Sequence, residues 1–406
     1  MIAIIILPEN WIQIASIPFV AAFVGWITNK IAIKMTFYPL TFWGIPPYLG
    51  WQGIIPSKAK KMAETSVDLI TNNLLRVEER FDQLDSEEIN RHIEHSLQLS
   101  SKKILNEVGT ARFPLLWKRL PPSLKTELEQ NIYHELPQVL SNIIADFKKH
   151  INQVFDIKNM VVSALVSDKN LLNEIFLQCG EKEFKFIEKS GFYFGFLLGI
   201  VQMFIWLVYP QWWTLPLAGI LVGYVTNWLA LKLIFSPVKP IYIGKIRFQG
   251  LFIQRQQEVA EAYAALVAQK IFTPDKIFEA IVYGPTADNF AAVIDKHVKD
   301  LVDKISDEGE MMALVKLFSN ERNFEAMRNI AAYSFKEDLP IILLDVYDYT
   351  AKSLDIQNTL HQKMAALSAP EFVGFLHPVF QEDETKLILV GAFLGGLAGW
   401  IQYLLM

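Results

Sequence analysis

One fifteen-residue pattern occurs twice in this chain and constrains its fold more than any other feature. The first copy, GWITNKIAIKMTFYP, runs from Gly25 to Pro39, and the second, GYVTNWLALKLIFSP, runs from Gly223 to Pro237. The copies start 198 residues apart in a chain of 406 residues. Because both keep the same glycine, threonine, asparagine, alanine, lysine, phenylalanine and proline positions, the chain is expected to consist of two similar halves.

Four stretches of the sequence are apolar and long enough to cross a membrane as helices. A hydrocarbon core about 30 Å thick needs about 20 apolar residues in a helix. The chain is 52% hydrophobic with a mean hydropathy of +0.24, yet 20% of its residues are charged. This mixture indicates membrane spans joined to sizeable soluble parts. The predicted spans are residues 11–35, 191–209, 212–235 and 387–406.

Lysine and arginine lie on one side of every predicted span. Residues 1–29, the link at 210–211 and the chain end after Lys386 contain neither residue type. Because positive residues favour the cytosolic side, we expect a multi-pass protein of the inner (plasma) membrane with both termini outside the cytosol. Residues 36–186 and 236–386 would then form two cytosolic lobes.

The duplication extends well beyond the fifteen-residue pattern. QGIIPSKAKKMAE at residues 52–64 matches QGLFIQRQQEVAE at residues 249–261. Each half, residues 1–209 and 210–406, is therefore predicted to contain an inward helix, a cytosolic lobe and an outward helix. Because a unit with two spans ends on the side where it began, we expect parallel repeats related by a pseudo-two-fold axis along the membrane normal.

The lobes have the pattern of amphipathic helices. Apolar residues recur every three or four positions from Leu136 to Phe155, which is typical of one helix face. A small β-hairpin is expected in PIYIGKIRFQG at residues 240–250, with a turn at Gly244 and Lys245. Its counterpart WGIPPYLGWQG is too rich in proline to predict a good strand. The fold class is therefore an all-α integral membrane protein with a small hairpin after the inward helix.

Small residues lie on one face of each predicted span, and such faces let helix backbones approach closely. We expect these faces to meet at the centre of the bundle. The packing glycines are Gly25, Gly191, Gly195, Gly199, Gly223, Gly391, Gly395 and Gly399.

The repeated Thr-Asn pair has two interpretations, and the sequence leaves both open. In one, the side chains form hydrogen bonds between helices, worth about 0.6–2 kcal/mol. In the other, they form a polar site for an ion, a solute or a lipid headgroup. The candidate intramembrane site is Thr28, Asn29, Lys34, Thr226, Asn227 and Lys232, and the matched interfacial loops contain Gln52, Gly53, Gln249 and Gly250.

The block TNWLALKLIFSPVKPIYIGKIRFQGLF, followed by RQQEVAE, resembles the DUF445 family, also called the UPF0754 or YheB-like membrane proteins. The resemblance covers essentially the whole chain. Tyr38 and Ser236 stand where arginine is usual in the family, which weakens a basic interfacial patch. The resemblance implies a membrane location and a fold but no established activity.

No residue pattern predicts catalysis or a cofactor. Walker, G-x-S-x-G, H-E-x-x-H and dinucleotide motifs are absent from the sequence, and Cys179 has no obvious triad partner. His92 and His95, with Glu87 or Glu88, have the spacing of a metal site on a helix. Their charged surroundings favour a solvated face instead, so we expect neither a metal nor a cofactor.

The preferred function is a non-enzymatic scaffold or interaction platform that carries two cytosolic helical lobes. The alternative is a lipid-handling or small-solute transport protein that uses the paired Thr-Asn motifs, and a membrane-interface hydrolase would need a nucleophile–base pair that the sequence lacks. A continuous apolar cavity in the lobes would favour the alternative.

Expected partners are membrane lipids, proteins on the lobes and further copies of the chain. The net charge of −5 argues against nucleic acid.

Overall fold

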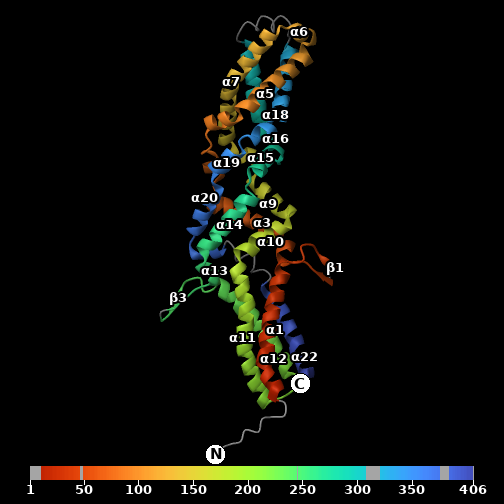
Figure 1. The fold of residues 1–406 in the computed structure, drawn as a ribbon, viewed down its shortest axis with the longest axis vertical. Helices are drawn as coiled ribbons and strands as arrows, with labels where there is room; N and C mark the ends of the chain where they lie inside the picture. Colours follow the sequence, from red (N-terminus) through yellow and green to blue (C-terminus); the bar gives the residue numbers. More distant parts are fainter. Residues whose placement is uncertain (1–10, 46–48, 245, 308–320, 375–383, 406) are drawn as a thin grey trace, which may run out of the picture. The chain divides into compact units, whose positions relative to one another are not determined.

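The computed structural model describes residues 11–45, 49–244, 246–307, 321–374 and 384–405. The described residues form helices and two short hairpins, so the expected all-α class is confirmed (Figure 1). The chain divides into two compact units. Unit 1 comprises Met1–Leu69, Leu165–Leu266 and Leu360–Met406, and unit 2 comprises Ile70–Ala164 and Val267–Thr359. Each unit thus takes segments from both halves of the sequence.

Unit 1 contains four helices that are long and apolar enough to cross a membrane. They are α1 (Trp11–Phe37), α11 (Glu181–Val208), α12 (Thr214–Phe235) and α22 (Glu384–Leu405). The predicted span at residues 191–209 is the apolar part of α11, which begins ten residues earlier. A hydropathy search detects the apolar stretch of a helix and not the residue at which the helix begins. It therefore did not detect the polar first turns of α11.

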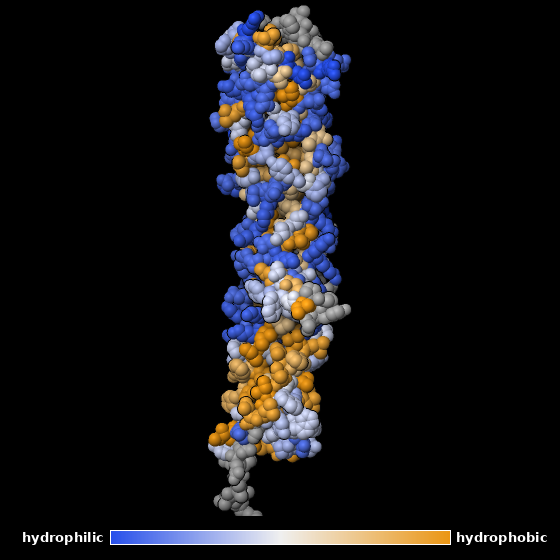
Figure 2. Space-filling view, turned by 90° about the vertical axis from the view of Figure 1, so that its right-hand side faces the viewer, coloured by the Kyte–Doolittle hydropathy of each residue, from blue (hydrophilic) through white to orange (hydrophobic). Residues whose placement is uncertain are grey.

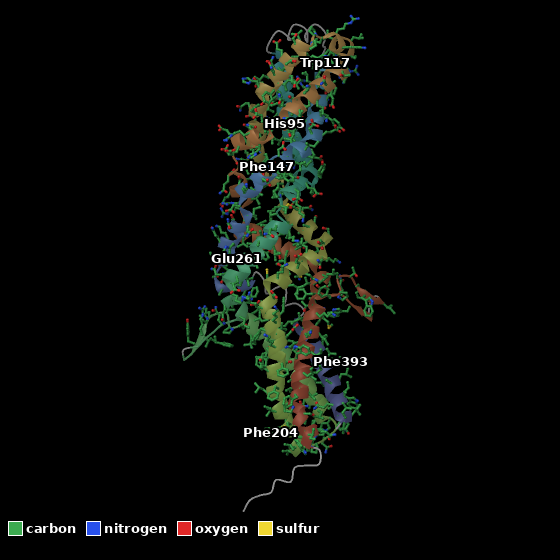
Figure 3. All side chains as sticks on the ribbon, in the orientation of Figure 1. His95, Trp117, Phe147, Phe204, Glu261 and Phe393 are labelled. Atoms are coloured by element: carbon green, nitrogen blue, oxygen red, sulfur yellow. The ribbon has the colours of Figure 1, made fainter. Side chains whose placement is uncertain are left out.

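The outer surface of the four spanning helices is apolar, and their closest backbone contacts are made by small residues. Phe204 and Phe393, labelled in Figure 3, have 59% and 72% of their surface exposed. Apolar residues gather over this part of unit 1 in the space-filling view (Figure 2). The large side chains therefore face outward, which suits a lipid environment where burying them brings no hydrophobic gain.

Shorter helices complete unit 1 and connect it to unit 2. Helices α2 (Ile54–Ser57), α3 (Ala59–Leu69), α10 (Lys169–Cys179) and α13 (Leu251–Gln254) lie within unit 1. The chain passes from one unit to the other within α9 (Ile157–Ser167), α14 (Gln256–Lys270) and α20 (Ile356–Ala365).

Helices α1 and α12 are each followed by an antiparallel hairpin. Strands β3 (Ile241–Ile243) and β4 (Ile246–Phe248) form the hairpin expected in residues 240–250. Gly244 has a φ of 63°, the left-handed conformation that favours glycine in a turn; Lys245 of the expected turn lies outside the described residues.

The first half also forms a hairpin, which the sequence analysis judged too proline-rich for a good strand; that judgement was wrong. Strand β1 (Trp43–Ile45) pairs with β2 (Leu49–Trp51). Proline weakens a ladder only where an N–H must donate, and the paired positions of β1 and β2 contain no proline.

Unit 2 is built around a four-helix bundle that draws two helices from each half. The helices are α5 (Ser86–Arg112), α7 (Pro122–Lys149), α16 (Ala287–Asp307) and α18 (Glu321–Leu344). Helices α5 and α16 each pack against both α7 and α18. The amphipathic faces of one half are therefore buried by those of the other. The smaller elements are η1 (Ile70–Leu74), α4 (Val77–Phe81), α6 (Pro114–Arg119), α8 (Ile151–Val154), α15 (Pro274–Tyr283) and α19 (Tyr347–Leu354).

The apolar stripe predicted in the first lobe forms part of the core of this bundle. Leu140, Ile143 and Phe147 of α7 are buried. The ring of Phe147 (Figure 3) lies 5.6 Å from that of Phe290 in α16, in an edge-to-face arrangement. Aromatic pairs of this geometry contribute about 0.5–1.5 kcal/mol beyond their buried area. The stripe therefore joins the two halves.

Polar contacts also join the two halves within unit 2. Asp338 of α18 accepts hydrogen bonds from Ser100 at 2.7 Å and Lys103 at 2.6 Å, both on α5. Asp146 of α7 accepts from Lys296 at 2.9 Å and from His297 at 2.8 Å, both on α16. These contacts set which helices neighbour one another.

Asp146 is expected to make unit 2 acid-sensitive. Hydrogen bonds from Lys296 and then His297 lower the pKa of Asp146 from 3.8 to about 2. A carboxyl whose pKa is depressed by folding stabilises the folded state above its unfolded pKa, and this contribution is lost as the pH falls through its folded pKa. The thermal unfolding midpoint should therefore fall more steeply from pH 4 to pH 2 in the wild type than in Asp146→Asn. Equal slopes for the two proteins would contradict the prediction.

Candidate functional site

The two Thr-Asn motifs lie where α1 crosses α11 and where α12 crosses α22. Asn29 of α1 donates from Nδ2 to the carbonyl oxygen of Ile187 in α11, at 2.6 Å. Asn227 of α12 donates in the same way to Leu387 of α22, at 2.9 Å. Both asparagines are buried. Each amide therefore ties one pair of spanning helices together.

Glycines bring the backbones of these helix pairs into direct contact. A Cβ atom added at Gly25 would lie 2.2 Å from the carbonyl oxygen of Gly191, and one added at Gly223 would lie 2.1 Å from that of Gly391. Real Cβ atoms do not approach backbone so closely. The remaining packing glycines meet backbone or Cβ atoms at 2.1–2.7 Å when a Cβ is added: Gly195, Gly199, Gly395 and Gly399. The small faces thus meet in pairs, α1 with α11 and α12 with α22, rather than all together at the bundle centre.

The other residues of the candidate intramembrane site are placed differently. Thr28 donates from Oγ1 to Gly25 of its own helix at 3.1 Å, and Thr226 lies 3.5 Å from the corresponding carbonyl oxygen of Gly223. Lys34 and Lys232 are exposed, and Lys232 Nζ lies 4.6 Å from the centre of the Trp228 ring. The structure brings the asparagines and glycines together and leaves the lysines at the surface.

Each motif asparagine keeps one buried oxygen without a protein partner. The Oδ1 atoms of Asn29 and Asn227 have no hydrogen bond to any of the described residues. A small cavity of about 40 Å³ adjoins Asn227, with Thr36 and Glu183 as its other polar lining residues. It has room for water and is far too small for a lipid. The geometry favours a helix-joining role for the two asparagines.

Replacing Asn227 by leucine is expected to weaken the contact between α12 and α22. The lost hydrogen bond is worth about 0.6–2 kcal/mol, and removing the unpartnered oxygen offsets part of this loss. The measurement is the free energy of unfolding in detergent micelles. The matched control is Tyr224→Leu, an exposed position on the same helix, which should leave the stability nearly unchanged; an equal loss in both variants would contradict the prediction.

The matched Gln-Gly pairs form hydrogen bonds to the residues that directly follow α1 and α12. Gln52 donates from Nε2 to Leu40 at 2.7 Å, and Gln249 donates to Val238 at 2.9 Å. The backbone N–H groups of Gly53 and Gly250 donate to Pro39 at 2.9 Å and to Pro237 at 3.0 Å. Gln52 and Gly53 therefore make the same two hydrogen bonds in the first half that Gln249 and Gly250 make in the second. We call this arrangement the Gln-Gly bracket.

A buried ion pair lies next to this cavity, at residues that no sequence motif singled out. Arg255, the residue after α13, donates from one nitrogen to both carboxylate oxygens of Glu183 in α11, at 2.6 and 2.7 Å. Only 4% of the Glu183 side chain and 22% of that of Arg255 are exposed. Burial alone would lower the pKa of Arg255, but the hydrogen bonds and charge of Glu183 outweigh it and raise that pKa. The sequence did contain a signal for this position. In the aligned repeat blocks Arg255 matches Lys58, so both halves have a basic residue there.

The remaining candidates for chemistry are not gathered into a site. Burial raises the pKa of the Cys179 thiol to about 12, so the thiolate needed for nucleophilic chemistry is scarce. His92 and His95 are exposed, His95 is labelled in Figure 3, and the His92 ring lies 5.5 Å from that of Tyr349. Among the described residues, no group of three histidine, cysteine or acidic side chains is arranged to hold a metal.

Comparison with known proteins identifies the relatives of this chain. The sequence model of the family described as "Protein of unknown function (DUF445)" matches residues 19–155. A UPF0754 membrane protein of Bacillus mycoides (strain KBAB4) is 26% identical over 204 residues, which are 44% of this chain and 53% of that protein. One from Thermosynechococcus vestitus is 29% identical over 165 residues, 38% of this chain and 40% of the relative. The resemblance to this family is confirmed, but the family model matches residues 19–155 and not essentially the whole chain as expected.

The matches cover part of each relative. The chain spans about half the length of the curated Bacillus relatives it matches. A UPF0754 membrane protein of Picosynechococcus reaches 36% identity, over 73 residues that make up 16% of this chain and 18% of that protein. No solved structure matches.

Proposed function

We propose, from this relationship to the DUF445 and UPF0754 membrane proteins, that the chain is a multi-pass inner-membrane scaffold. In this proposal unit 1 is the membrane anchor and unit 2 is a helical platform for protein partners. The supporting observation is the backbone contact between glycine faces, because it makes the spanning helices a closely packed anchor. A platform for protein partners needs an anchor that fixes its position in the membrane, and it does not need a path for solutes through the membrane.

The proposal includes the repeat and the orientation. The two halves carry the same helix pair, the same hairpin and the same Gln-Gly bracket, as parallel repeats would. The excess of lysine and arginine on one side of the spans supports a cytosolic location for residues 36–186 and 236–386, with both termini outside the cytosol.

The packing of the spans argues for an anchor over a conduit. Each helix pair brings backbone atoms together at the glycines, and the lysines of the Thr-Asn motifs are exposed rather than turned toward the asparagines. A solute path needs polar groups around a continuous space. The cavity next to Asn227, at about 40 Å³, is mostly apolar.

A second candidate function, lipid handling, is favoured by the interior of unit 2. One apolar cavity of about 130 Å³ lies among α5, α6, α7, α16 and α18, and its lining includes Val108, Trp117 and Ala331. Another of about 90 Å³ lies further along the bundle, next to Phe147 and Phe290. Both are lined almost entirely by apolar atoms, as a site for an acyl chain would be.

Native mass spectrometry of the protein released from lipid nanodiscs separates the two candidates. A lipid held in unit 2 should be lost in Val108→Phe, which fills the larger cavity, and kept in Tyr283→Phe, an exposed substitution in the same unit. For a scaffold we expect the same lipid content in the wild type and both variants. Selective loss of one phospholipid in Val108→Phe would instead establish lipid handling.

The platform itself is tested by photo-crosslinking in cells. A photoreactive residue at Tyr283 or Tyr333, exposed on unit 2, should give discrete protein adducts, whereas one at Leu197, exposed on α11, should react with lipid. Absence of protein adducts from every exposed position tried on unit 2 would overturn the scaffold.

A further inference from the structure

The two hairpins of unit 1 expose large apolar and aromatic side chains. Trp43 has 79% of its surface exposed, Ile45 71% and Tyr242 67%. Phe42, Ile241 and Phe248 are also exposed. The hairpins project away from the helices on opposite sides of unit 1 (Figure 1). Such a surface is unfavourable in water, and a two-stranded hairpin without a partner is at best marginally stable there.

Hydrogen bonds hold each hairpin at the end of a spanning helix. The indole Nε1 of Trp51 donates to the carbonyl oxygen of Met35 in the last turns of α1, at 3.1 Å. The Gln52 and Gly53 bonds to Leu40 and Pro39 close the base of the first hairpin. The corresponding bonds of Gln249 and Gly250 close the second. The hairpins therefore leave unit 1 at the level where α1 and α12 end.

The composition of the hairpins fits the boundary between lipid headgroups and acyl chains. Tryptophan and tyrosine concentrate there because one end of each side chain is apolar and the other forms hydrogen bonds. Arg247 stands opposite Tyr242 in the register of the second hairpin, and Lys34 and Lys232 are exposed near the ends of the same two helices. Cationic groups at this level attract anionic headgroups.

We infer that both hairpins lie in the membrane interface, in the leaflet where the inward helices end, and bind lipid rather than a protein. They extend the anchor sideways on two sides. A tilt of unit 1 would pull one hairpin out of the interface and push the other deeper, so the pair resists tilting and sets the depth of the bundle. The role is independent of whether unit 2 acts as a scaffold or handles lipid.

Spin labels test this placement in nanodiscs of phosphatidylethanolamine and phosphatidylglycerol. Ile45→Cys and Ile241→Cys place one label on each hairpin while Trp43 and Tyr242 stay in place. The native Cys179 is buried and does not compete for the reagent. Leu197→Cys on α11 is the lipid reference, and Tyr283→Cys on unit 2 is the water reference; both positions are exposed.

The quantity measured is the accessibility of each label to oxygen, which dissolves in lipid, relative to a nickel complex, which stays in water. We expect the oxygen-to-nickel accessibility ratios at Ile45→Cys and Ile241→Cys to be several times the ratio at the water reference, Tyr283→Cys. Both should be lower than the ratio at the lipid reference, Leu197→Cys. Adding Trp43→Asp to Ile45→Cys should shift that ratio toward the water reference. Ratios equal to the water reference, or low accessibility to both reagents as under a protein partner or second copy, would overturn the inference.

Discussion

Replacing Arg255 by leucine is expected to lower the free energy of unfolding by about 3–5 kcal/mol, the usual cost of removing one partner of a buried ion pair. The Glu183 carboxylate accepts two hydrogen bonds from this guanidinium, and only 4% of the Glu183 side chain is exposed. Without Arg255 the carboxylate stays in a nearly dry site beside an apolar cavity. The measurement is equilibrium unfolding of the full chain in detergent micelles.

Two further variants show whether the loss comes from the unpaired charge. Glu183→Met combined with Arg255→Leu removes both charges and should recover much of the stability, because apolar replacements of a whole buried pair are often neutral. Lys182→Ala breaks an exposed pair with Glu258, whose side chains are 63% and 55% exposed, and should cost about 0–1 kcal/mol. A double variant as unstable as Arg255→Leu alone would show that packing, not charge, holds this site.

Alanine at two adjacent glycines of α22 should have unequal consequences. At Gly395 a Cβ would lie 2.1 Å from the carbonyl oxygen of Gly219, and a backbone atom cannot turn aside. We expect Gly395→Ala to separate α12 from α22 and to cost about 1–3 kcal/mol, the range for overpacking, despite the better helix propensity of alanine.

Gly396→Ala is the matched control on the same helix. Its nearest neighbour would be Cγ1 of Ile220, at 2.6 Å, a side-chain atom that can shift at a cost of about 0.5–1.5 kcal/mol. Alanine gains about 1 kcal/mol over glycine in a helix, which offsets this cost, so Gly396→Ala should lose much less stability than Gly395→Ala. The measurement is the free energy of unfolding of both variants in micelles. Similar losses of stability at the two positions would refute the predicted backbone contact.

The first half offers an independent check of the same principle. A Cβ at Gly195 would lie 2.5 Å from the carbonyl oxygen of Ala21, so Gly195→Ala should also destabilise the protein. Because α1 and α12 belong to different helix pairs, the two losses should add within about 0.5 kcal/mol.

Much of the fold was predictable because its signals are local. A run of about 20 apolar residues has few alternatives to a spanning helix, and the spans followed from that alone. The second hairpin followed from alternating apolar residues around Gly244. The first hairpin was misjudged because Pro46 and Pro47 were counted against the strands, although the strands begin and end outside that pair.

The candidate site was predictable in part. The repeat singled out Asn29 and Asn227 and the packing glycines, since matched polar and small residues in a span stand out from an apolar background. The hydrogen-bond partners of these residues were not predictable. Asn29 donates to Ile187, and Arg255 donates to Glu183, and in both cases the two residues lie far apart in the sequence. Pair contacts of this kind leave no periodic signal in a single chain.

The sequence by itself determined the membrane-spanning helices, their number in the described chain, the duplication and the apolar faces, because each depends on composition and spacing along one segment. Only the tertiary structure decided that the small faces meet in pairs within each half, and that helices α5, α7, α16 and α18 from both halves share one bundle. The physical reason is that an amphipathic face requires burial but does not specify its partner. The choice among similar faces is made by side-chain fit and by bonds such as that of Lys103 to Asp338.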